Sequence, residues 1–550
     1  MTPSRGLGFQ AVLDRFTASH PTVSEVLMKY QINRTCPRWT LFSACFVSSC
    51  IAINSSALAA NFVWNAGSGS WPNAANWLPF GVPGFNDNVF IGAPAPGLQP
   101  GVVSGSGTFH SMNLSNGMVV DTAGGQIGSL GVAQVSGNGT GIIARLSLIG
   151  INEHDFSAHL QLISPGTWLE LRDNAAVRLF STPSEPSYSV GEIRGQGFID
   201  VIGSEPFKNN GTIRPTANGG LTIRQSNGAG TLLPINLDGP LETGQIIFDV
   251  LNSLLVVEGS GLSDSFSGFI SMAPGAHLQM SLTDPWELGL GSQLNVTGNG
   301  QFPIASRITG APLIVNGNVQ VGSAGSFLRL QSPTTFQPFA NISIHADNRL
   351  RSEASTIIQA GAVFALGSSA DLEFVGVTTV QGGVFNTPSE SLSDGFVRFD
   401  GQTTWNGTVT VNGAAMQNGI ATVSGPTTIN ADRFDMDGLA ATTWNINQNL
   451  MMNVGALSVV QPNHFEGTFN LGNTLGARLT MNLNDPAASW HLDGTMNIAG
   501  NPALFVTRLD GSRMVVEGNW NVLNGRARVN NDIVFSASGA GGPAEISINP

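Results

Sequence analysis

The sequence predicts an all-β protein whose short strands stack as a solenoid, and three observations support this prediction. Glycine accounts for 68 of the 550 residues, well above its usual share of about 7 per cent. Charged residues make up 11 per cent, less than half of the usual ~25 per cent, whereas hydrophobic residues make up 41 per cent. Short runs of alternating apolar and polar residues recur between glycine, asparagine, serine and proline, and such alternation is typical of strands.

Residues 1–59 have the features of a leader that is removed on export. Two arginines precede an apolar stretch over residues 40–53, and Ala57-Leu58-Ala59 then matches the pattern of a signal-peptidase site. The apolar stretch is too short to span a membrane, so we expect a signal peptide that is cleaved after Ala59. Met28 is the alternative start of translation. All three cysteines lie in the leader, so we expect no thiol in the mature chain.

Residues 60–100 are expected to form a cap at the start of the solenoid. Trp64, Trp71 and Trp77 lie close together in this stretch, and Pro83-Gly84 then predicts a turn before a strand. An uncovered first turn would expose apolar side chains and unpaired strand edges, which a cluster of large aromatic side chains can cover. The alternative interpretation is an aromatic platform on which a sugar ring stacks.

From residue 101 onward, related phrases return every 20–30 residues. The phrases that begin at Gly467, Gly494 and Gly518 share the form glycine, polar, apolar, asparagine, apolar, with steps of 27 and 24 residues. Units this short cannot each bury a core, so they must stack on one another. We therefore predict a right-handed parallel β-helix over residues 101–550, in which the asparagines of these phrases form ladders from one coil to the next.

A longer internal repeat encloses these single coils. The segment Gly275–Pro285 (GAHLQMSLTDP) matches Gly476–Pro486 (GARLTMNLNDP), 201 residues further along the chain. We therefore predict an internal duplication with units at about 238–343 and 437–548. The pattern is still in progress at Pro550, so we expect the sequence to be truncated at its C-terminus, as a piece of a longer polypeptide.

The expected signal peptide, the tryptophan-rich opening and the Gly/Asn/Thr-rich coils resemble those of secreted bacterial parallel β-helix proteins. Autotransporter passenger domains and related surface adhesins are the group to which the pattern is most similar. The resemblance covers most of residues 61–550 and rests on the coil pattern rather than on one diagnostic motif. It implies an exported, elongated, non-enzymatic protein of the cell surface or the extracellular space, with extracellular glycans, matrix or further copies of the chain as partners.

Charge and motif content exclude several other classes of partner. The formal net charge is −13 and lysine is nearly absent, so the chain lacks the basic patch that nucleic-acid binding needs. No apolar run reaches the ~18 residues of a membrane span, so we expect no integral membrane segment in the mature chain. Nucleotide-binding glycine loops, a Gly-x-Ser-x-Gly elbow and the short zinc-binding motifs are absent, and we expect no cofactor.

Polysaccharide lyases and glycoside hydrolases also occur on parallel β-helices, and such an enzyme is the alternative function. These enzymes need clustered acidic residues, because one group protonates the leaving oxygen while another stabilises or activates. The best candidates are His345, Asp347, Arg349 and Arg351, whose alternation would place them on one face of a strand. This group could orient an acidic glycan, with Asp347 as a base or cation ligand. A solvated outer strand gives the same alternation, so we assign no catalytic residue.

A second candidate group contains Asp432, Asp435 and Asp437, followed by Gly438. Aspartate-rich turns with glycine suit calcium, which takes several oxygen ligands in a flexible loop. The spacing of an EF-hand is missing, however, and a plain acidic turn has the same composition. We therefore predict no metal site, with these three aspartates as weak calcium candidates.

Overall fold

The computed structural model describes residues 59–548 with gaps, and the expected leader lies outside the described residues apart from Ala59. The gaps are at residues 93–100, 110, 116–117, 123–126, 130–132, 136–143, 150–152, 156–159, 166, 185, 217–219, 240–242, 299–303, 390–394, 437–441, 457–462, 473–476, 500–505, 525 and 537–544.

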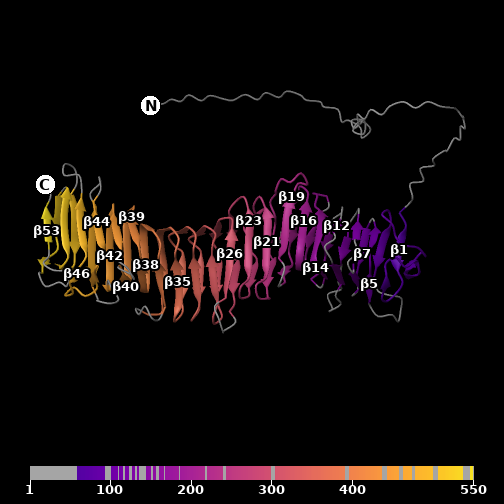
Figure 1. The fold of residues 1–550 in the computed structure, drawn as a ribbon, viewed down its shortest axis with the longest axis horizontal. Coiled ribbons are helices and arrows are strands. Elements are labelled where there is room, and N and C mark those ends of the chain that lie inside the picture. Colours follow the sequence, from indigo (N-terminus) through magenta and orange to yellow (C-terminus); the bar gives the residue numbers. More distant parts are fainter. Residues whose placement is uncertain are drawn as a thin grey trace, which may run out of the picture. The chain divides into compact units, whose positions relative to one another are not determined.

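The described chain winds into a parallel β-solenoid whose turns stack in chain order (Figure 1). In the middle of the chain each strand pairs in parallel with the third strand after it, so that three strands make one turn. One such turn comprises β24 (Trp286–Leu288), β25 (Gln293–Val296) and β26 (Ala305–Gly310), and the next comprises β27 (Leu313–Val315), β28 (Asn318–Val321) and β29 (Phe327–Leu330). The described part contains about 17 turns, which confirms the predicted all-β parallel β-helix. Its right-handed sense stays a prediction.

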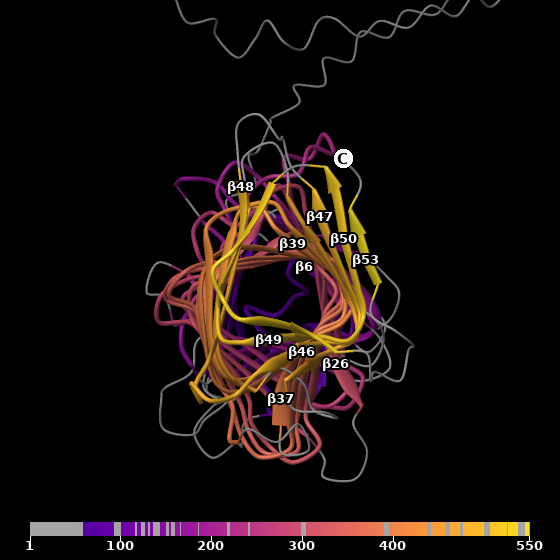
Figure 2. The ribbon, with the colours of Figure 1, turned by 90° about the vertical axis from the view of Figure 1, so that its left-hand side faces the viewer.

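In the middle of the chain the strands of each turn thus surround the core on three sides, and the end-on view in Figure 2 shows the stacked turns enclosing one interior. Alternate residues of each strand point inward, and Leu294, Val319 and Ile342 on successive turns are nearly or fully buried. Because in-register parallel strands repeat every ~4.8 Å, large side chains at matching positions stack on one another. The rings of Phe364 and Phe385, for example, are stacked with their centroids 4.8 Å apart.

The three N-terminal tryptophans fill the interior of the first turns. Strand β1 (Asn61–Trp64) pairs antiparallel with β3 (Trp77–Leu78), and at most 1 per cent of Trp64, Trp71 or Trp77 is exposed. The Trp77 ring meets the other two edge-on at centroid distances of 4.9 and 5.0 Å. Since all three rings are buried, they offer no open face on which a sugar could stack.

The predicted asparagine ladders are confirmed on the last turns. Asn470 donates a side-chain hydrogen bond to Asn445 (2.9 Å), Asn497 donates to Asn470 (2.9 Å) and Asn521 donates to Asn497 (3.0 Å). These residues occupy equivalent positions of four neighbouring strands of one sheet, namely β41 (Thr443–Ile446), β44 (Thr468–Leu471), β47 (Thr495–Ala499) and β50 (Asn519–Asn524). The ladder satisfies side-chain polar groups between turns without any charge.

We expect Asn497→Ala to lower the free energy of unfolding of these turns by about 1–2 kcal/mol, because two ladder hydrogen bonds are lost. Asn521 makes one of these bonds, so Asn521→Ala should cost about half as much. Urea unfolding, with hydrogen exchange of β44 and β47 as the local readout, measures both. Equal effects of the two substitutions would contradict a ladder in which each bond contributes.

The matching segments of the longer repeat adopt the same local structure. They form β23 (His277–Leu282) and β45 (Arg478–Leu483), and on the next turn Gly310 and Gly511 lie opposite the methionine of each strand. Both glycines have a positive φ, 101° and 111°. A Cβ atom would lie only 2.2 or 2.0 Å from the carbonyl oxygen of that methionine, so both positions require glycine. The duplication itself stays a prediction.

Candidate functional site

Of the four residues that were expected to share one strand face, the structure places only Arg349 and Arg351 together on one strand. Asp347 lies in a turn with a φ of 60°, and β32 (Arg349–Ser352) begins only after that turn. The shared face is therefore not formed, because the chain passes a corner between His345 and Arg349. His345 is exposed, and its Nε2 atom lies 3.0 Å from the amide nitrogen of Gln320.

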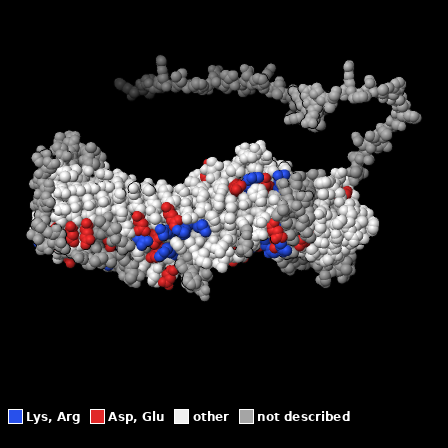
Figure 3. All heavy atoms as spheres, in the orientation of Figure 1, with Lys and Arg blue, Asp and Glu red and all other residues white. Residues whose placement is uncertain are grey.

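Arg349 and Arg351 instead belong to an ion-pair network that crosses four neighbouring strands of one sheet. These strands are β29, β32, β35 (Ala370–Phe374) and β37 (Gly395–Phe399). We define the network as four arginines and four acidic residues: Arg329, Arg349, Arg351, Arg398, Glu353, Asp371, Glu373 and Asp400. Figure 3 shows acidic and basic side chains gathered together over the middle of the solenoid.

Glu373 is the most buried carboxylate of this network, with 5 per cent of its side chain exposed. It lies 2.6 Å from Arg398 and 3.6 Å from Arg351. Arg398 also bonds Asp400 at 2.8 Å, and Arg349 bonds Asp371 at 2.8 Å. Each arginine thus faces at least one carboxylate, which indicates that the network stabilises the surface rather than holding an unpaired acid or base for catalysis.

The environment of Glu353 holds its carboxyl group in the ionised form. Burial by itself raises the pKa of Glu353, but hydrogen bonds from Gln331 and Arg329 and the charges of Arg329 and Arg351 outweigh it. The pKa therefore lies below its ordinary value of 4.5. A carboxyl group whose pKa is lower in the folded state stabilises the fold above the unfolded-state pKa, and this contribution is lost as the pH falls through the folded-state pKa.

We expect the turns that contain the ion-pair network to lose stability as the pH falls below the ordinary glutamate pKa of 4.5, and the Glu353→Gln variant to lose less over the same range. The amide of glutamine carries no charge and cannot titrate. The variant therefore lacks the charged hydrogen bonds at every pH, and its free energy of unfolding at pH 7 should be lower by something on the order of 1 kcal/mol. Urea unfolding at a series of pH values measures the difference. Two parallel pH profiles would show that Glu353 has no part in the acid sensitivity.

Two of the three calcium candidates, Asp432 and Asp435, lie on one described strand. Strand β40 (Thr427–Asp435) leaves Asp432 exposed, with its carboxylate accepting a hydrogen bond of 2.8 Å from the backbone N–H of Gly413. Asp435 is buried at the end of the same strand. Asp437 lies outside the described residues, so the weak calcium candidates stay an untested hypothesis.

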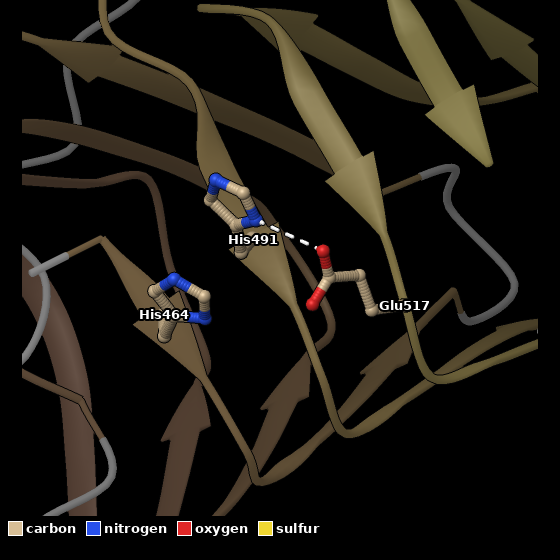
Figure 4. Close-up of side chains that lie close together, drawn as sticks. All are labelled: His464, His491 and Glu517. Carbon is tan, nitrogen blue, oxygen red and sulfur yellow. Dashed lines mark ion pairs between the residues drawn. The ribbon is translucent and has the colours of Figure 1, made fainter. Parts of the chain in front are cut away.

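A cluster of two imidazoles and two carboxylates lies on the outer side of the last turns. His464 of β43 (His464–Phe465) is the register partner of His491 of β46 (Trp490–Leu492), and the two rings are stacked at a centroid distance of 4.2 Å. Glu517 directly follows β49 (Met514–Val516) on the next turn, and its Oε1 lies 3.5 Å from Nδ1 of His491 (Figure 4). Asp493 accepts a 2.7 Å hydrogen bond from Nδ1 of His464. We name these four residues the histidine cluster.

Sequence reasoning missed the histidine cluster, although the sequence contains the signal for it. The three glycine phrases are preceded by the same pattern, which reads His464-Phe-Glu-Gly, His491-Leu-Asp-Gly and Val515-Val-Glu-Gly. The 27-residue step between the first two phrases also separates the two histidines. A repeat that stacks its glycines must stack the residues three positions earlier as well, so the pairing could have been predicted.

A hollow of about 740 Å³ lies on the N-terminal half of the solenoid. Its lining includes Arg178 and Phe180 of β14 (Thr167–Phe180), Asp200 of β16 (Glu192–Ile202) and Arg224 of β19 (Leu221–Ser226). Asp200 accepts two hydrogen bonds from Arg224, at 3.0 and 2.8 Å, and these bonds raise the pKa of that arginine. The hollow therefore combines apolar surface with fixed charged groups.

Comparison with protein-family models, with curated proteins and with solved structures finds no match to this chain. Among the described residues, no helix has the length and apolar character that crossing a membrane requires. The fold by itself defines the class of protein as a parallel β-solenoid.

Proposed function

We propose that this protein is an exported, elongated and non-enzymatic protein of the cell surface or the extracellular space. Its long sides would bind extracellular glycans, matrix or further copies of the chain. The observation that carries the proposal is the mutual pairing of the charged side chains in the ion-pair network. Its four arginines and four carboxylates neutralise one another across four strands. Within that network the charged groups are engaged with each other, which favours a structural role over a catalytic one.

The stacked turns favour an extended structural protein on energetic grounds as well. In a solenoid each turn contacts only its neighbours, so stability grows as turns are added and no closed globular shape is needed. The continuous apolar core and the asparagine ladders supply that stability with few charges. Such a scaffold presents long, regular sides on which a polymeric partner can lie.

The hollow beside Phe180 is our candidate for a contact with a glycan. Ligand sites are mostly apolar hollows with a few fixed polar groups, and Asp200 and Arg224 hold each other in place there. A sugar offers both an apolar face and hydroxyl groups, which matches this lining. The proposed contact requires no chemical change in the glycan.

Incubation of the full chain with a panel of acidic and neutral polysaccharides tests this proposal. We expect cosedimentation with at least one insoluble polysaccharide, without new reducing ends or unsaturated uronates. Phe180→Ala should reduce the cosedimentation, whereas Phe339→Ala, at an exposed position elsewhere, should not. Release of cleaved product that disappears in Asp347→Ala would contradict the proposal and support a polysaccharide-degrading enzyme.

A further inference from the structure

We propose that His464, His491 and Glu517 bind one divalent transition-metal ion of the zinc class, which joins three consecutive turns of the solenoid. One nitrogen of each imidazole and one carboxylate oxygen of Glu517 all lie within 4.8 Å of one another. The three residues come from β43, β46 and the residue after β49, which pair in order within one sheet. An ion bound there would therefore add a further link between turns that are also joined by backbone hydrogen bonds, core packing and the asparagine ladder.

The spacing of the donor atoms suits a tetrahedral ion. Zinc binds imidazole nitrogen at about 2.0–2.1 Å, which places neighbouring ligand atoms of a tetrahedron about 3.4 Å apart. Nδ1 of His491 and Oε1 of Glu517 are 3.5 Å apart, close to that value. The donor nitrogen of His464 lies within 4.8 Å of both other donors. All three side chains are partly exposed, between 20 and 28 per cent, so side-chain rotation is available.

The two imidazoles differ in their hydrogen bonding. Asp493 can only accept, so Nδ1 of His464 donates the 2.7 Å bond, and this nitrogen lies on the side of the ring that faces Glu517 (Figure 4). A metal ion would take the place of that proton, because a ligating imidazole must be deprotonated at the donor nitrogen, and the Asp493 carboxylate would then lie beside the ion. Nδ1 of His491, in contrast, is buried and makes no hydrogen bond, although it faces a carboxylate. A bound cation would satisfy both that nitrogen and Glu517.

The donor set also selects the kind of metal. Imidazole nitrogen suits zinc, copper, nickel and iron, whereas calcium and magnesium prefer oxygen ligands. Three protein donors leave one position of a tetrahedral zinc ion open for water or for a group of a partner. Because the ion would link separate turns, binding should protect these turns against local unfolding.

Titration of the metal-free full chain with Zn²⁺ against a chromophoric chelator tests this proposal, with Ca²⁺ and Mg²⁺ as parallel titrations. We expect one Zn²⁺ per chain, no comparable binding of the other two ions, and slower hydrogen exchange in β43, β46 and β49 when zinc is present. Cobalt(II) should give the strong visible absorption of a tetrahedral site. The substitutions His464→Gln and His491→Gln should each weaken zinc binding at least about tenfold.

His345→Gln is the matched control, because it removes an exposed imidazole outside the histidine cluster and should leave zinc binding unchanged. Circular dichroism and hydrogen exchange of the zinc-free variants confirm that each remains folded. The proposal is overturned if the native chain binds zinc no more tightly than His464→Gln and His491→Gln, or if His345→Gln weakens binding as much as they do. It is equally overturned if Ca²⁺ binds the cluster as tightly as Zn²⁺.

Discussion

The substitution Trp405→Ala is expected to lower the free energy of unfolding of the surrounding turns by about 3–5 kcal/mol. Trp405 lies in β38 (Thr403–Gln417) and is fully buried. Its ring meets Phe399 edge-on at a centroid distance of 5.0 Å and stacks on Trp444 at 6.3 Å. Alanine would leave a cavity that these rigid neighbours cannot fill, so both the buried area and the ring contacts are lost.

Because turns of a solenoid contact only their neighbours, the loss caused by Trp405→Ala should be local. Hydrogen exchange should accelerate in β38, β39 (Ile420–Val423) and β41, and much less in the first turns. Phe339→Ala is the control, because that ring is 69 per cent exposed and its removal should cost less than about 0.5 kcal/mol. Similar effects of the two substitutions would contradict the assignment of Trp405 to the core.

The second large effect is expected for Gly310→Ala, which should cost about 3 kcal/mol or more. Gly310 has a φ of 101°, and a Cβ atom there would lie 2.2 Å from the carbonyl oxygen of Met280 on the preceding turn. An L-residue is strained at this φ, and the clash would also push apart two paired strands. We therefore expect disruption of the pairing between β23 and β26, measured by urea unfolding and hydrogen exchange.

Gly291→Ala provides the matched control for Gly310→Ala. Gly291 also has a positive φ, 91°, but a Cβ atom there would have nothing within 4 Å. Its substitution should therefore cost only the backbone strain, about 1–2 kcal/mol. If the two substitutions had equal effects, the close approach of neighbouring turns at Gly310 could not be correct.

The regular features of the fold were predictable from the sequence because they depend on short-range spacing. The steps between glycine phrases are enough to place Asn470, Asn497 and Asn521 in register. The middle of the chain is harder, because the length of a turn changes from 25 to 23, 22 and 21 residues along one sheet between Gln293 and Val384. Because the length changes, the sequence spacing does not predict which residues become neighbours on the next turn.

The candidate sites show the same limit at the level of single residues. Polar residues alternate from His345 to Arg351 in the sequence, but a turn at Asp347 precedes the strand that begins at Arg349. The alternation alone does not show where one strand ends and the next begins. The carboxylate that pairs with Arg349, Asp371, is 22 residues away and was not predicted. The histidine cluster was within reach, because His464 and His491 follow the same repeat step as the glycines.

The location and the mature termini of the native protein test the central proposal, export of a structural solenoid, most directly. Mass spectrometry of the culture medium, the cell envelope and the cytosol of the producing organism provides this measurement. We predict a product that begins at Ala60 and is found in the medium or the envelope. Detection of the chain only in the cytosol, with residues 1–59 still attached, would contradict the proposal.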